Sequence, residues 1–152
     1  MEAASRVTEG VRAPPGRPVL LATMGVPFDP DASTFAVDAA VEAGQALIVV
    51  NVVELPPLTM SVRMGYDQLP ETDEDAAAFR APAALAHSLG VRVERLRVRS
   101  PRPVEALLEL TAERAPSVLV FGPDRDRIKR RVYRKATKAI RDRVACLVWV
   151  PD

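Results

Sequence analysis

Short apolar runs alternate with amphipathic segments along most of this chain. Runs at 19–23, 46–53 and 117–121 are almost continuously hydrophobic, and each ends near a glycine or a charged residue. Such runs are typical of strands that are buried on both faces of a parallel sheet. A run at 146–150 predicts a final strand close to the end of the chain.

The segment 91–98 has a different pattern, in which apolar and charged residues alternate. The alternation slips once, at Arg95 and Leu96. Alternation with period two is expected of a strand with one exposed face. We therefore predict a half-exposed strand at an edge of the sheet.

Between these runs, apolar residues recur at helical spacing, which predicts helices in most of the intervening segments. Asp29 can cap a first helix, Pro30 suits its first position, and Gly44 ends it. Further helices are expected at 71–90, where Pro82 favours a kink or a split, and at 103–115 and 131–144. The long loop between residues 54 and 70 is either functional or mobile.

Strands that alternate with helices predict an α/β fold. We expect an open parallel sheet of five strands, with helices on both faces and right-handed crossovers. Ligands of such sheets bind beyond the carboxyl ends of the strands, where the strand order reverses. The polar residues 1–17 are expected to form a flexible tail, and residues 18–152 a single domain.

The end of the chain carries the best-matching part of a family resemblance that extends from about Pro18 to Asp152. Residues 118–151 read VLVFGPDRDRIKRRVYRKATKAIRDRVACLVWVP, with a strand, a glycine loop, a helix and a final strand in succession. This stretch resembles the universal stress protein family, whose fold is of the adenine-nucleotide α-hydrolase-like kind. The resemblance implies a homodimer joined through the last strand, at Leu147, Val148, Trp149 and Val150.

Part of that family binds ATP, through Gly-x2-Gly-x9-Gly-(Ser/Thr) after the fourth strand and an Asp at the end of the first. Glycines let backbone N–H groups approach phosphates, and a hydroxyl at a helix N-terminus completes the anion site. This chain keeps the first loop glycine, Gly122, and Gly25 beside the position of the Asp. It departs from the motif at Met24, Arg125, Lys135 and Ala136, and Val52 and Arg127 complete the candidate nucleotide or anion positions. These departures imply the branch that does not bind ATP.

Composition leaves little room for catalysis. The chain has one cysteine, Cys146, and one histidine, His87, with a net charge of +1. An intramolecular disulfide and a cysteine metal cluster are therefore excluded. We find no nucleophile–base pair, and we expect no enzymatic activity, no metal and no cofactor. Cys146 and Met24 are interpreted as packed side chains, and His87 as a cation near a helix end.

Positive charge is concentrated between residues 124 and 143, with ten basic and three acidic residues. On a helix, Arg127, Arg131, Arg134, Lys138 and Arg141 would form one stripe, and Val132, Ala136, Ile140 and Val144 would pack on the sheet. The stripe is either an anion site or a solvated face balanced by the acidic segment 67–75. Its lack of interleaved aromatics beyond Tyr133 does not favour nucleic acid.

The expected function follows from these observations. The chain is interpreted as a cytoplasmic, dimeric, non-enzymatic stress-response or regulatory module, without a membrane segment and open to a further protein partner. The alternative is a nucleotide or phosphate-ligand binder, with ATP or AMP as ligand, that uses the Arg-rich loop 125–135 in place of glycines and hydrolyses ATP slowly. Met60 and Met64, in the long loop, could form a lid over the crevice or a dimer contact.

Overall fold

The computed structural model describes residues 17–55 and 73–151, except for the side chains of 73–79. Its strands are β1 Val19–Thr23, β2 Leu47–Glu54, β3 Val93–Ser100, β4 Val118–Phe121 and β5 Leu147–Trp149. Its helices are α1 Pro30–Ala43, α3 Asp73–Ser88, α4 Pro103–Arg114 and α5 Arg130–Arg143. The predicted tail up to residue 16 and the loop with Met60 and Met64 lie outside the described residues, as does most of the acidic segment 67–75.

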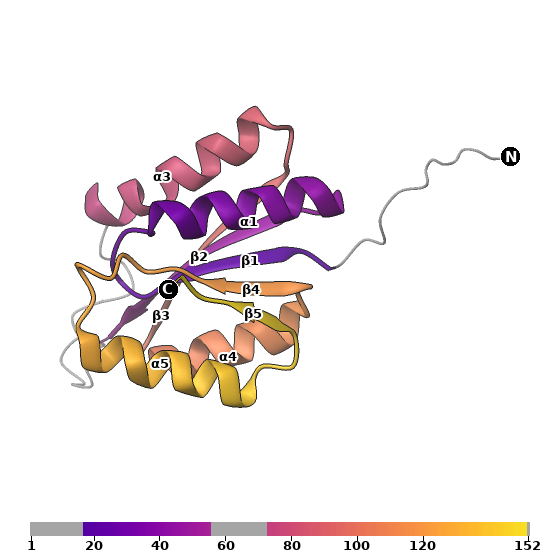
Figure 1. The fold of residues 1–152 in the computed structure, drawn as a ribbon. Helices are drawn as coiled ribbons and strands as arrows, with labels where there is room; N and C mark the ends of the chain where they lie inside the picture. The colour runs from indigo at the N-terminus through magenta and orange to yellow at the C-terminus, as the bar shows by residue number, and fades with distance from the viewer. Residues whose placement is uncertain (1–16, 56–72, 152) are drawn as a thin grey trace, which may run out of the picture.

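The five strands form one parallel sheet in the order β3-β2-β1-β4-β5, which confirms the predicted fold class. Helices α1 and α3 cover one face, and α4 and α5 cover the other (Figure 1). Each face buries its own apolar cluster, with Val37 and Val49 on the α1 side and Leu107 and Ile140 on the α5 side. The first half of the chain adds β2 and β3 on one side of β1, and the second half adds β4 and β5 on the other side. The strand order therefore reverses between β1 and β4.

Helix α1 forms as the local sequence predicts. The Ala32 N–H donates to the carboxylate of Asp29 at 3.0 Å, and Pro30 occupies the first turn. Gly44 ends the helix in the left-handed conformation, with φ of 65°. Small residues on the inner face, including Ala32 and Ala36, are completely buried, so the helix lies close to the sheet.

Two elements refine the predicted pattern. β3 is an edge strand, as its alternation indicated, but it begins at Val93 and ends at Ser100, two residues later than predicted. Helix α3 continues through Pro82 and is therefore not split. The proline removes one backbone donor, and the rest of the helical ladder persists around it.

Helix α5 places its basic and apolar residues somewhat differently from the prediction. Ala136 and Ile140 are buried and Val144 packs against the core, but Val132 is 38% exposed. Tyr133 takes the inward place instead, because the next residue on a helix is turned by about 100°. Arg127 precedes the helix, so it does not belong to the helical stripe.

Candidate functional site

The loops that follow β1 and β4 meet where the strand order reverses. The Asp29 N–H donates to the Gly122 carbonyl at 2.9 Å, and the Asp124 N–H donates to the Pro27 carbonyl at 2.8 Å. Phe28 and Pro123 form an antiparallel bridge between these two bonds. The two loops are therefore fastened to each other across the carboxyl ends of the central strands.

Gly122, the retained glycine of the phosphate-loop motif, has a packing role here. Its N–H donates to the Ala22 carbonyl at 2.9 Å, in continuation of the β1–β4 pairing. A Cβ added at this position would overlap the Cβ of Ala32 on α1. Its φ is not positive, so the need for glycine here is one of space.

Gly25 differs, because it has a φ of 74° and open space around it. Its N–H donates to the side-chain Oδ1 of Asn51 at 2.8 Å, which ties the β1 loop to β2. Sequence reasoning missed Asn51, which is buried with 1% of its surface exposed. A single amide within the apolar run 46–53 was the signal that could have identified it.

Arg125, at the second glycine position of the motif, lies over an aromatic ring. Its guanidinium carbon is 4.3 Å from the ring centre of Tyr133, a cation–π arrangement. Tyr133 is 7% exposed, and burial raises the pKa of its hydroxyl. That hydroxyl has no hydrogen-bond partner among the described residues.

A hollow of about 430 Å³, here called the carboxyl-end hollow, opens beside this ring. Its lining brings three carboxylates and two guanidinium groups together: Asp29, Asp124, Arg125, Asp126, Ile128, Arg130, Tyr133 and Pro151. Of the predicted nucleotide or anion positions, only Arg125 is part of it. The mixed charges give the hollow no strong preference for a phosphate.

The remaining motif positions lie inside helix α5. The helix begins at Arg130, so Lys135 and Ala136 are in its second turn and not at its N-terminus. Ala136 is completely buried, and Lys135 is exposed. The hydroxyl of the neighbouring Thr137 donates within the helix, where the carbonyls of Tyr133 and Arg134 are 2.9 and 3.0 Å away.

Met24 and Val52, from the other side of the predicted crevice, belong to the apolar interior. Met24 is partly buried and packs against the cluster under α4 and α5. Val52 is a buried member of the same cluster. The structure therefore places only part of the predicted site residues after β1 and β4, and it leaves the others on β2 or inside α5.

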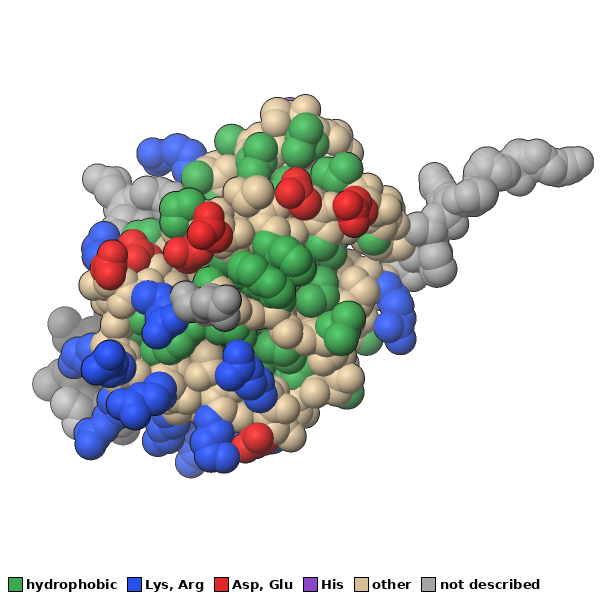
Figure 2. All heavy atoms as spheres, in the orientation of Figure 1, with side chains coloured by type: hydrophobic (Ala, Val, Ile, Leu, Met, Phe, Trp, Pro, Cys, Tyr) green, Lys and Arg blue, Asp and Glu red, His purple; other side chains and the backbone are tan. Residues whose placement is uncertain are grey.

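The outer face of α5 is basic. Exposed cations follow one another along it, and they are Arg130, Arg131, Arg134, Lys135, Lys138 and Arg141. Lys138 pairs with Asp142 at 3.0 Å, and Arg143 pairs with Glu105 on α4 at 2.8 Å. Figure 2 shows basic side chains over α5, acidic side chains over α1, and apolar side chains between them.

That apolar region includes the predicted interface strand. β5 is the second edge of the sheet, and Leu147 is 75% exposed. Val148, Trp149 and Val150 are partly buried. The Trp149 ring stacks on Phe35 of α1 with ring centres 4.3 Å apart.

The described residues hold no group of three or more His, Cys, Asp or Glu side chains placed to bind a metal ion. His87 is exposed in the last turn of α3. Cys146 is partly buried just before β5, and burial raises the pKa of its thiol. None of the helices in the described part of the chain has the length and hydropathy to cross a membrane.

Comparison with solved structures supports the fold. A universal stress protein family member from Burkholderia pseudomallei is 19% identical, with a TM-score of 0.59 over 90% of this chain and 96% of that one. A universal stress protein in complex with cAMP is 18% identical, with a TM-score of 0.61 over 91% and 98%. The universal stress protein from Archaeoglobus fulgidus in complex with dAMP is 17% identical, with a TM-score of 0.56 over 88% and 96%.

Sequence comparison identifies the family. A search of curated proteins finds no match. The sequence model of the universal stress protein family matches residues 16–150, which is nearly the whole chain. This chain therefore belongs to the universal stress protein family.

Proposed function

We propose that this protein is a nucleotide-independent member of its family, a non-enzymatic binding or regulatory module that acts without a cofactor. One observation carries the proposal. The N–H groups of both retained glycines already donate inside the protein, Gly25 to Asn51 and Gly122 to the Ala22 carbonyl. A glycine loop can hold phosphate only where such N–H groups are free.

The energetics point the same way. Withdrawing a hydrogen bond from each glycine would cost about 1–3 kcal/mol before any phosphate contact is gained. Ala136 supplies no hydroxyl, and Lys135 lies a turn inside α5. The carboxyl-end hollow sets three carboxylates against two guanidinium groups, so its charge does not favour a polyphosphate either. The cAMP and dAMP complexes of the two relatives are properties of those proteins.

Thermal unfolding of the purified protein with ATP, ADP, AMP and cAMP tests this proposal. A ligand at a hundred times its Kd stabilises a fold by about 2.7 kcal/mol, which is easily seen. We expect no shift at millimolar nucleotide, with or without Mg²⁺, and no phosphate release from ATP. The Archaeoglobus fulgidus relative, solved with dAMP, serves as the positive control.

The alternative, a binder that uses the Arg-rich loop, makes a distinct prediction. Arg125→Ala removes a guanidinium of that loop, and Arg92→Ala is a matched control at an exposed position near β3. An adenine-specific shift that resists salt, and that Arg125→Ala but not Arg92→Ala abolishes, would overturn our proposal. A shift with any polyphosphate that salt removes would reflect only the charge of α5.

We further propose that the module is a homodimer joined through β5. An edge strand exposes unpaired backbone groups, and pairing with a second copy satisfies them. The exposed Leu147 and the Phe35–Trp149 stack supply apolar area at this edge. Light scattering at micromolar concentration should give the dimer mass.

Substitution at the edge makes this test specific. Leu147→Lys should yield a monomer, because it places a charge on the pairing edge. Leu89→Lys, at another exposed leucine after α3, should leave the dimer intact. A wild-type protein of monomer mass would contradict the proposal.

A further inference from the structure

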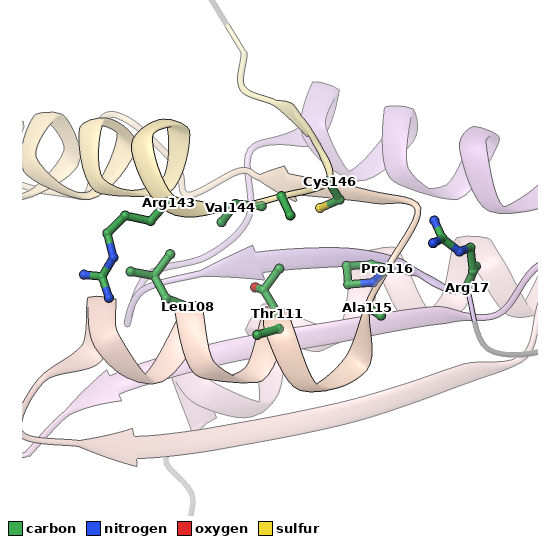
Figure 3. A pocket seen from close by; sticks show the side chains of 10 residues that line it. Arg17, Leu108, Thr111, Ala115, Pro116, Arg143, Val144 and Cys146 are labelled. Atoms are coloured by element: carbon green, nitrogen blue, oxygen red, sulfur yellow. The ribbon is translucent and has the colours of Figure 1, made fainter.

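A groove of about 330 Å³, here called the amino-end groove, lies at the amino ends of the strands, whereas the carboxyl-end hollow lies at their other ends. Helix α4 forms one wall, and the segment between α5 and β5 forms the other (Figure 3). None of the predicted nucleotide or anion positions lines it. It is therefore a separate candidate site, within the usual volume range of small-molecule pockets.

The walls of the groove are apolar. Leu108 of α4 lies across the groove from Val144 and Cys146, with Pro116 near one end. Ala112 of α4 also lines it. The one hydroxyl among the lining residues, on Thr111, already donates to the Leu107 carbonyl at 2.7 Å. The walls thus offer no unpaired side-chain hydroxyl, and they favour an apolar body.

The two ends of the groove carry arginines that differ in their pairing. Arg143, at one end, donates two hydrogen bonds to the carboxylate of Glu105, at 2.8 and 3.1 Å, so its charge is balanced. Arg17, at the other end, is exposed and has no ion pair or side-chain hydrogen bond among the described residues. Within the described part of the chain, the Arg17 end is therefore the one that offers an unpaired cation to a ligand.

We propose that the amino-end groove binds a straight-chain carboxylate of medium length. The acyl chain lies along α4, and the carboxylate is held by Arg17. A single planar guanidinium matches a carboxylate through two parallel hydrogen bonds. Because Glu105 balances the charge of Arg143, the Arg143 end of the groove is suited to the methyl terminus of the acyl chain.

Cys146 provides a direct readout, because it lines the groove and is the one cysteine in the chain. The rate at which iodoacetamide alkylates Cys146 in the full-length protein at pH 8.5 is measured with decanoate, decanol, butyrate or decyltrimethylammonium. Decanoate at four times its Kd should slow alkylation about fivefold. Butyrate and the cationic amphiphile should not slow it at the same concentrations.

Three variants separate this site from general effects of an amphiphile. Arg17→Ala should abolish the preference for decanoate over decanol. Ala112→Glu places a carboxylate at an exposed position of the α4 wall and should abolish protection. Ala84→Glu, at an exposed alanine of α3, is the matched control and should retain it.

The outcomes are distinct from those of the nucleotide experiment, because the two sites share no residue. Equal protection by decanoate and decanol would overturn the assignment to carboxylates. Protection that survives Ala112→Glu would overturn the assignment to this groove, as would alkylation that no amphiphile slows. Calorimetric titration with decanoate should reproduce the same order among the variants.

Discussion

The two ends of strand β4 are built from residues whose roles are the reverse of what their types suggest. Before the strand, Ala115 ends helix α4 in the left-handed conformation, with φ of 47°, where a glycine would fit with less strain. After the strand, Gly122 has no positive φ, but a side chain there would overlap Ala32. The comparison shows that a glycine in a motif position can be retained for packing alone.

The same two ends differ in what they offer a ligand. At the carboxyl end, the N–H groups of Gly25 and Gly122 are occupied, and carboxylates and guanidinium groups line the hollow together. At the amino end, the groove is apolar, and Arg17 has no partner in the described structure. In this chain the more apolar of the two hollows lies at the opposite end of the strands from the one where ligands of parallel sheets usually bind.

Gly122→Ala should have the largest effect on stability among the substitutions that test this comparison of the two ends of β4. The added Cβ must displace helix α1, and overpacking of this kind destabilises a fold by about 1–3 kcal/mol. We expect a value near the upper end of that range, because the contact is with the Cβ of a buried helical alanine. Urea denaturation monitored by circular dichroism measures it.

A second substitution identifies the cause. In an Ala32→Gly background the overlap disappears, so Gly122→Ala should cost much less than it does alone. Equal costs in both backgrounds would mean that Gly122 is not retained for contact with Ala32.

Ala115→Gly should have a smaller effect of opposite sign. A left-handed alanine is strained by about 1–2 kcal/mol, and glycine removes this strain from the folded state. Glycine also gives the unfolded chain more conformational entropy, which offsets about half of the gain, so the net stabilisation is about 0.5–1 kcal/mol. The melting temperature should rise. Ala112→Gly, inside the same helix, should lower stability by about 1 kcal/mol, and a loss at position 115 as well would contradict the assigned strain.

The smallest effect concerns the ion pair that braces the end of α4 against β3. Arg114 donates two hydrogen bonds to Glu94, at 2.8 and 3.1 Å, and this holds the pKa of Glu94 below its ordinary value. Its stabilisation is therefore present above the unfolded pKa and is lost as the pH falls below about 4.5 through the folded pKa. Both side chains are substantially exposed, so we expect only about 0.5 kcal/mol.

Glu94→Gln tests this pH dependence. The variant should be less stable than wild type at pH 7, and the difference should shrink as the pH falls below about 4.5, because the pKa of Glu94 is lowered in the folded protein. Glu109→Gln, an exposed position on α4, is the control for removing one negative charge. A difference that persists unchanged at pH 3 would exclude the ion pair as its cause.

Most of the fold could be predicted because its signals are local. The runs at 19–23 and 46–53, the alternation at 91–98 and the cap at Asp29 each record the environment of neighbouring residues. The prediction was wrong at Val132, because a difference of about 100° around the helix makes Tyr133 the inward residue instead. Of the kink or split considered at Pro82, the split does not occur. The element order then determined the layers, because parallel crossovers are right-handed.

The details of the site could not be predicted, because they depend on residues distant in sequence. That Gly122 meets Ala32 follows from how closely α1 lies on the sheet, which no local pattern records. Arg125 can lie over the ring of Tyr133 because α5 buries that ring beside the loop after β4. The amino-end groove likewise joins Arg17 to residues of α4 and of the segment between α5 and β5, which the sequence places far from it.

The pairing of β1 with β4 also has a consequence for biosynthesis. Val19 pairs with Val118, so the centre of the sheet joins segments roughly a hundred residues apart, a separation that slows folding. During translation β1 has only β2 beside it until β4 leaves the ribosome, which takes on the order of ten seconds at ordinary elongation rates. Over that interval the most hydrophobic strands of the protein have an open edge, and this is the stage at which a chaperone has most to protect.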